Sequence, residues 1–139
     1  MRQHQEELRI DTPGQGFHEI TLLVQTVVGR SGIAEGLATI FVRHTSCSLC
    51  IQENADPSAR RDMERWLAKI APEHDPAYTH TSEGPDDMPS HLRAMVTKTS
   101  ETIPIRGGQL GTGTWQGLYL CEHRVRNHQR RVIVHVLGE

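Results

Sequence analysis

The sequence predicts an α+β domain built on two packed, largely antiparallel β-sheets with two or three helices. Three observations lead to this fold class. Segments rich in β-branched and apolar residues dominate the chain. Only two segments show a clear helical pattern. Strands and helices also fail to alternate regularly, as a doubly wound parallel sheet would require. At 139 residues we expect one domain, residues 1–139.

The strands are predicted from short apolar or alternating segments that turn residues separate. We expect strands at residues 5–10, 17–21, 36–44, 46–51, 102–105, 117–125 and 131–137. The segment 21–28 fits a strand or a helix equally well by periodicity, and Gly29-Arg-Ser-Gly32 ends it. The basic segment 124–131 predicts a hairpin turn whose arginines lie at the surface or at an interface.

The two helices are predicted at Pro57–Ile70 and Asp87–Val96. The first has Asp56 as a good N-cap and a proline at its first position. Its apolar residues follow an i, i+3, i+4, i+7 pattern: Met63, Trp66, Leu67 and Ile70. The second opens with Asp87-Met-Pro-Ser, so that a proline lies in its first turn.

Composition excludes some partners. A formal net charge of −2 argues against nucleic acid or an anionic membrane as the main partner. No apolar run approaches the ~20 residues that a membrane helix needs, and the N-terminus lacks a signal-peptide core. The three cysteines suit a reducing compartment. We therefore expect a soluble, cytoplasmic protein.

Cys47-Ser-Leu-Cys50 matches a C-x-x-C pattern. Redox motifs of this kind lie at a helix N-terminus, whereas this one lies in a predicted strand. Residues i and i+3 of a strand point to opposite faces, so the two thiols should diverge. Small buried residues are the favoured interpretation, and redox or metal use is the alternative.

The segment from His80 to His91 is the strongest candidate for chemistry, because it holds two histidines and three carboxylates among turn residues. Imidazoles and carboxylates close together are typical ligands of divalent metal ions. If Asp87 caps the short helix, His91 lies one turn later on the same side. Asp87 can then be a ligand, or the carboxylate that orients an imidazole. The alternative is an exposed acidic loop with incidental histidines.

A third ligand is expected from a strand end. His44 lies where apolar residues give way to Thr45 and Ser46, whose hydroxyls could contact a phosphate oxygen. His123 lies at a similar boundary, and His44 is preferred because hydroxyl groups surround it. A structural role is also open for each of these histidines.

Two further polar segments stand out. Glu53 and Asn54 follow a strand, and helix capping by Asp56 does not explain them. The segment 111–117 places Trp115 and Gln116 among small residues just before a strand. It lacks the Lys-Ser/Thr ending of a phosphate-binding P-loop, so it is weak evidence for phosphate binding.

Several motifs occur in a characteristic order: His44-Thr-Ser, Gln52-Glu-Asn-Ala-Asp-Pro57, His80 with Asp87-Met-Pro-Ser-His91, Gly113-Thr-Trp-Gln-Gly117 and Glu122-His-Arg124. Together they resemble the YjbQ-like family, known as a secondary thiamine-phosphate synthase family. The resemblance covers residues 5–139, and Gly-Thr-Trp-Gln is its most recognisable part. Cys47 and Cys50 depart from it, because relatives usually carry small or hydroxyl residues there.

The resemblance implies a two-sheet α+β fold, a homotrimer, and a metal-lined site near a subunit boundary. It matches His44, His80 and His91 to recurring histidines of the family. Combined with the analysis above, it gives the expected site. The metal ligands are His44, His80 and His91; the catalytic candidates are Glu53, Asp87, Glu122 and Arg124; the substrate contacts are Thr45, Ser46, Asn54, Trp115 and Gln116. The expected cofactor is a divalent ion, with zinc favoured and magnesium or another ion as alternatives.

Three functions are compatible with these residues. The first is a metal-dependent enzyme acting on a small phosphorylated molecule. The resemblance names its activity as joining a pyrimidine diphosphate to a thiazole phosphate, with release of diphosphate. The second is a metal-dependent hydrolase with Glu53 or Asp87 as general base. The third is a non-enzymatic trimer that binds a metal or ligand.

Overall fold

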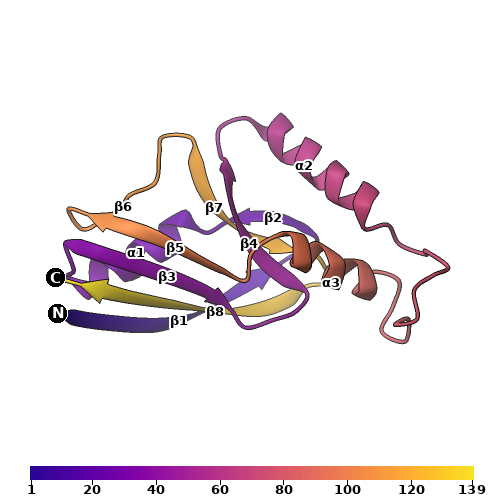
Figure 1. The fold of residues 1–139 in the computed structure, drawn as a ribbon, viewed down its shortest axis with the longest axis horizontal. Coiled ribbons are helices and arrows are strands. Elements are labelled where there is room, and N and C mark those ends of the chain that lie inside the picture. Colours follow the sequence, from indigo (N-terminus) through magenta and orange to yellow (C-terminus); the bar gives the residue numbers. More distant parts are fainter.

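The computed structural model describes residues 1–139 and contains two antiparallel sheets and three helices (Figure 1). This confirms the predicted fold class. The larger sheet has the strand order β1-β8-β3-β5-β6, with every neighbouring pair antiparallel. Its strands are β1 (Arg2–Thr12), β3 (Glu35–Val42), β5 (Ser100–Arg106), β6 (Gln109–Leu110) and β8 (His128–Gly138).

The smaller sheet has the order β2-β7-β4 and is also antiparallel. Its strands are β2 (Gly16–Glu19), β4 (Cys47–Glu53) and β7 (Gln116–Glu122). The predicted strand 117–125 therefore ends at Glu122. The last strand starts at His128, earlier than predicted, so the turn between β7 and β8 is confined to residues 123–127.

The three helices are α1 (Thr21–Ser31), α2 (Pro57–Ile70) and α3 (Asp87–Val96). The last two have the predicted bounds. The ambiguous segment 21–28 is helical because Val24, Val27 and Val28 form one completely buried face. Gly32 ends α1 in the left-handed conformation that glycine adopts without steric cost.

The main core lies between the larger sheet, α1 and one face of the smaller sheet. It is a cluster of 19 buried apolar residues. The opposite face of the smaller sheet carries a second, small cluster, in which Phe17, Tyr119 and Cys121 pack with Leu67 of α2. The expected apolar face of α2 is therefore used only in part: Leu67 is buried, whereas Trp66 and Ile70 are exposed.

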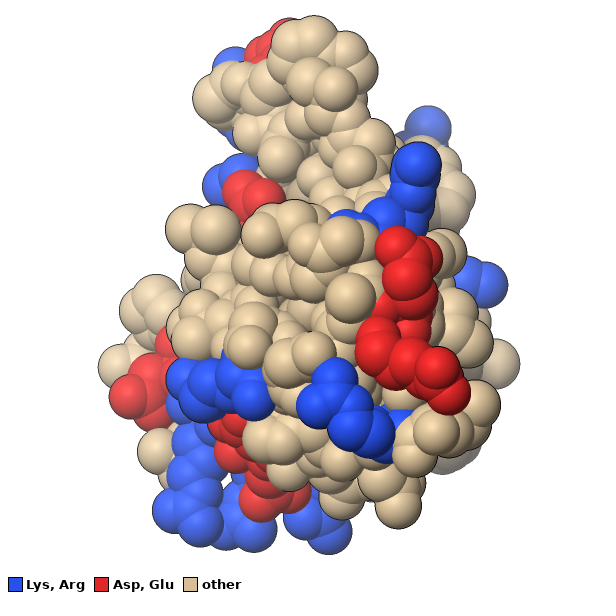
Figure 2. Space-filling model, turned by 90° about the vertical axis from the view of Figure 1, so that its left-hand side faces the viewer, with Lys and Arg blue, Asp and Glu red and all other residues tan.

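The surface carries charges of both signs. On the face where both termini lie, Figure 2 shows Lys and Arg side chains next to Asp and Glu side chains. Among the ion pairs of the protein, Arg30 Nη2 lies 2.6 Å from Oε1 of Glu6. None of the three helices has the length and apolar character needed to cross a membrane.

Candidate metal centre

Three side chains from α3 and the loop before it converge on one point. The Nε2 atom of His80 lies 2.7 Å from Oδ2 of Asp87, and Nε2 of His91 lies 3.2 Å from the same oxygen. The three candidate ligand atoms all lie within 4.8 Å of one another. Two imidazole nitrogens and one carboxylate oxygen at this separation form a donor set that suits a zinc-like ion.

Local helix geometry brings two of these residues together. Asp87 is the first residue of α3, and His91 follows one turn later, so both side chains lie on the same side of the helix. The expected shared side is therefore confirmed. The expected cap is wrong by one residue, because Asp86 occupies the N-cap position.

A backbone carbonyl fixes the orientation of His91. Its Nδ1 lies 3.0 Å from the carbonyl oxygen of Thr45. Because a carbonyl can only accept, Nδ1 carries a proton, and Nε2 is the ring nitrogen that faces Asp87. Histidines that bind metals are commonly held by such a contact on the other ring nitrogen. Thr45 thus takes part in the centre through its backbone.

Arg124 holds the other side of the carboxylate. Its Nη1 donates to Oδ1 of Asp87 at 2.7 Å, and its Nε donates to Oδ2 of Asp86 at 3.0 Å. Burial raises the pKa of Asp86, but hydrogen bonds from the Val125 N–H and from Arg124 outweigh burial and leave the pKa below its usual value. Arg124 therefore positions Asp87 and leaves Oδ2 facing the two histidines.

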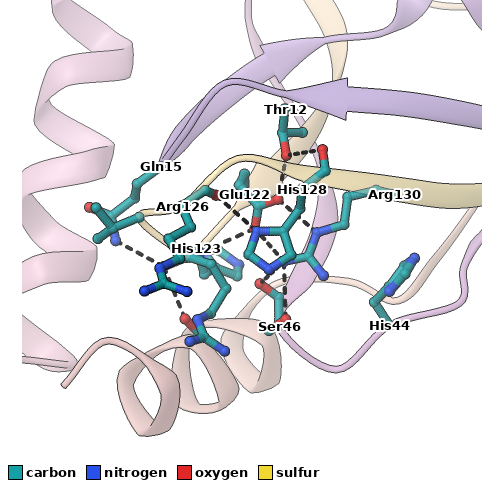
Figure 3. Close-up of polar contacts among 12 residues, drawn as sticks. Thr12, Gln15, His44, Ser46, Glu122, His123, Arg126, His128 and Arg130 are labelled. Carbon is teal, nitrogen blue, oxygen red and sulfur yellow. Dashed lines mark hydrogen bonds and ion pairs between the residues drawn. The ribbon is translucent and has the colours of Figure 1, made fainter. Parts of the chain in front are cut away.

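Glu122 and Arg130 form a buried ion pair (Figure 3). Arg130 Nε donates to Oε1 of Glu122 at 2.7 Å, and Thr12 donates to the same oxygen at 2.6 Å. Arg130 also donates to the Ser46 hydroxyl at 3.0 Å. Burial raises the pKa of Glu122, but hydrogen bonds from Arg130 and Thr12 outweigh burial and lower it. Glu122 is therefore a buried carboxylate that the protein itself satisfies.

This pair is joined to the candidate centre through the backbone. The N–H of Arg124 donates to Oε2 of Glu122 at 3.1 Å. Glu122 thus fixes the backbone of Arg124, whose side chain holds Asp87. The expectation that the arginines of 124–131 lie at the surface or at an interface is wrong for Arg130, whose side chain is buried. The sequence pattern does indicate this burial, because Arg130 is two residues before Val132 and therefore on the same face of β8 as the buried Val132 and Val134.

His44 lies near this group but does not join it. Its Nε2 accepts a hydrogen bond from the backbone N–H of Arg131 at 2.8 Å. Burial, together with the positive charge of Arg130, lowers the pKa of His44. His44 and His91 nevertheless line the same open groove, about 650 Å³ in volume. Within one chain the donor cluster therefore consists of His80, Asp87 and His91. His44 lines the neighbouring groove and is not part of the cluster.

His123 is a core residue. Its Nε2 lies 2.8 Å from the Ser48 hydroxyl, and its carbonyl oxygen accepts hydrogen bonds from Gln15 and Ser90. Burial, with the charge of Arg93 adding to it, lowers the pKa of His123 to about 4. The side chain is therefore neutral at pH 7, and it ties α3 to the smaller sheet.

The model of the UPF0047 protein YjbQ-like family matches residues 6–139. The chain belongs to this family. It is 56% identical over 138 residues to the UPF0047 protein sll1880 of Synechocystis, covering 99% of this chain and 94% of that one. It is 38% identical to the UPF0047 protein YjbQ of Escherichia coli O157:H7, covering 98% and 99%.

Solved structures of similar proteins share the fold. The conserved hypothetical protein TT1486 of Thermus thermophilus superposes with a TM-score of 0.85 at 34% identity, covering 95% of this chain and 99% of that one. A protein of unknown function from Sulfolobus solfataricus has a TM-score of 0.87 at 24% identity, covering 99% and 100%. None of these names states an activity, so the site must be interpreted from its own chemistry.

The remaining predicted site residues of this YjbQ-like chain lie at the other end of the smaller sheet. Glu53 is paired with Gln116, whereas Cys47, at the opposite end of β4, is paired with Glu122. These ends are six residue steps apart along the strand, which is about 20 Å. Asn54 Nδ2 donates to the Gln116 carbonyl at 3.4 Å, and Trp115 is exposed beside them. A single chain therefore does not bring this group to the histidines.

Proposed function

We propose that this protein binds one divalent metal ion at His80, Asp87 and His91 and uses it on a small phosphorylated substrate. The observation that carries the proposal is the convergence of both imidazole Nε2 atoms on Asp87 Oδ2, at 2.7 and 3.2 Å. Zinc is the favoured ion because nitrogen donors dominate the set. Magnesium is disfavoured by the same argument, since it prefers oxygen ligands.

The surroundings of the three residues fit an ion. The Asp87 side chain is 3% exposed, with one oxygen held by Arg124, so the other is fixed in place. The histidine side chains are 47% and 30% exposed, so the centre is open toward solvent. Three protein ligands with an open side are typical of catalytic zinc sites, whereas structural sites are closed by four ligands.

A bound ion would supply a Lewis acid for a phosphate oxygen or lower the pKa of a coordinated water. The protein's own residues would orient this centre and its substrate. Arg124 holds Asp87, and the Thr45 carbonyl holds the His91 ring. The groove of about 650 Å³ beside His91 is of the size that small-molecule sites have. Arg43, His44 and Thr45 line it, and these are donor-bearing residues that suit a phosphate group.

We infer that the reaction is a transfer in which diphosphate departs, because the family resemblance points to thiamine-phosphate synthesis. The charge of an ion beside Arg124 suits a departing diphosphate. Hydrolysis of a phosphate or ester is the second candidate. The open side of the centre favours it, because a water molecule can approach there.

The distant group at Glu53, Asn54, Trp115 and Gln116 can serve the same centre only from a neighbouring copy, since about 20 Å separates the two ends within one chain. The family resemblance implies a homotrimer, and we propose that in it the groove of one subunit meets the Trp115 loop of the next. Light scattering tests this directly: a mass of about three chains of 15.6 kDa is expected, and a monomer at working concentration contradicts it.

The experiment for the metal measures zinc, manganese and magnesium content and affinity in the purified protein and in the variant His80→Ala/His91→Ala. His135→Ala is the matched control, because His135 lies on β8 of the larger sheet, outside the candidate centre, and contacts Gln5. We expect one zinc per chain in the native protein and in the control, with none in the double variant. Zinc retained by the double variant would overturn the site.

The activity is measured on two substrate sets: a pyrimidine diphosphate with a thiazole phosphate, and single phosphate or ester compounds. Turnover of the first set alone supports the transferase, because only that reaction needs two organic substrates. Turnover of the second set alone supports the hydrolase. A protein that binds zinc and converts neither set would be the non-enzymatic metal-binding protein.

A further inference from the structure

Two cysteines from neighbouring strands meet in the smaller sheet. Cys50 on β4 lies opposite Tyr119, and Ser48 lies opposite Cys121 on β7. Cys50 and Cys121 are therefore diagonal neighbours on one face of the sheet. Their Sγ atoms are 3.5 Å apart. The C-x-x-C partner Cys47 faces away into the main core, as the strand geometry predicted.

The two thiols differ in their access to solvent. Cys121 is completely buried. Cys50 lines a groove of about 270 Å³ between β4 and α2, together with Met63, Trp66 and Lys98. The groove exists because α2 buries only Leu67 and leaves Trp66 exposed. A small oxidant can therefore reach Cys50 and cannot reach Cys121 directly.

The contact also makes the two sulfurs chemically unequal. The Cys121 thiol donates to the Cys50 sulfur, which lowers the pKa of Cys50. The same contact, together with burial, raises the pKa of Cys121 well above its usual value. Burial raises the pKa of Cys47 to about 12, so that thiol is inert.

We propose that Cys50 and Cys121 form a redox-active dithiol, in which Cys50 reacts first with a peroxide and Cys121 then closes a disulfide. In the first step the Cys50 thiolate attacks hydrogen peroxide, the O–O bond breaks, and hydroxide leaves and takes up a proton. Cys50 is oxidised to a sulfenic acid while the peroxide is reduced.

In the second step the Cys121 sulfur, after losing its proton, attacks the Cys50 sulfur. The S–S bond forms, the S–O bond breaks, and the hydroxyl leaves as water with that proton. The sum is two thiols and one hydrogen peroxide giving one disulfide and two waters. Closing from 3.5 Å to a bond of about 2.05 Å needs a local shift of β4 against β7.

The test treats the native, full-length protein with hydrogen peroxide, then unfolds it in denaturant with iodoacetamide present so that buried free thiols are alkylated as well, and maps the peptides by mass spectrometry. We expect one disulfide linking Cys50 to Cys121, with Cys47 still alkylated. A dithiol reductant should restore all three thiols. Because this measurement uses the native chain, it does not depend on the folding of any variant.

Three variants separate the roles. Cys47→Ser is the matched control and should form the disulfide like the native protein. Cys121→Ser should leave Cys50 as a sulfenic acid that dimedone traps. Cys50→Ser should leave Cys121 unoxidised. The proposal is overturned if peroxide leaves all three native thiols free while it oxidises a small-molecule thiol, or if the disulfide includes Cys47.

Discussion

Replacing His123 should remove a large pH dependence of stability. The native side chain is 2% exposed. Burial and the positive charges of Arg93 and Arg130 hold its pKa at about 4, against a usual value of 6.5, although Glu122 acts in the opposite direction. Between these two values the unfolded chain binds a proton that the folded chain does not. The free energy of unfolding therefore rises with pH across this window and falls as the pH drops from 6.5 toward 4.

The size of the effect follows from the pKa difference. A difference of about 2.5 units, at 1.36 kcal/mol per unit, gives about 3 kcal/mol. Between pH 7 and pH 4 the native protein should lose about 3 kcal/mol more stability than the variant His123→Gln. Gln is chosen because it stays neutral and can still hydrogen-bond to Ser48.

The assay is urea unfolding at a series of pH values from 7.5 to 4, with the slopes compared rather than the absolute stabilities. The carboxylates that titrate in this range are the same in both proteins, so they cancel in the difference. His74→Gln is the control: the His74 side chain is 77% exposed, and this variant should follow the native curve. Parallel curves for the native protein and His123→Gln would refute the argument.

Three further outcomes are expected. Glu122→Leu should lower the free energy of unfolding by about 3–5 kcal/mol, measured by urea unfolding, because it leaves the buried Arg130 guanidinium without its partner. Arg124→Gln should weaken zinc affinity about 10–100-fold in calorimetric titration, since Asp87 loses the donor that fixes it. A smaller loss than threefold would show that Arg124 does not position Asp87. Gly36→Ala should destabilise the protein by about 3 kcal/mol in thermal unfolding, because the added Cβ meets the backbone oxygen of Leu137 across the sheet.

Local patterns made much of the fold predictable. The bounds of α2 follow from its capping residue, its proline and its apolar spacing, and the start of α3 follows from the proline in its first turn; these features act within a few residues of the chain. The helix α1 was not decided by its own sequence, because three valines fit a strand as well as a helix. Its burial against both sheets decided it, and that depends on residues far away in the chain.

The candidate centre was predictable to a similar extent. The segment from His80 to His91 supplies all three clustered donors, and the spacing of Asp87 and His91 follows from one helical turn. The third expected ligand was His44, but a backbone N–H from β8 occupies its Nε2. Such a contact depends on the pairing of distant strands, which sequence spacing does not reveal.

The buried pair of Glu122 with Arg130 shows the same difficulty. Arg130 was placed in a hairpin by its basic neighbours, whereas it belongs to the buried face of a strand that starts at His128. The strand was predicted to start at residue 131 and starts at His128. This small difference in the boundary is why the prediction put Arg130 at the surface, although its side chain is in the core. The alternation with Val132 and Val134 was the signal that could have corrected it.

The most direct test of the metal centre is a crystal structure grown with zinc and measured at the zinc absorption edge. We predict one anomalous peak per chain, with the Nε2 atoms of His80 and His91 and Oδ2 of Asp87 each at about 2.0–2.2 Å from it. At least one coordination position should be open toward the groove that His44 lines. Full zinc occupancy elsewhere on the chain, with these three side chains unchanged, would contradict the account.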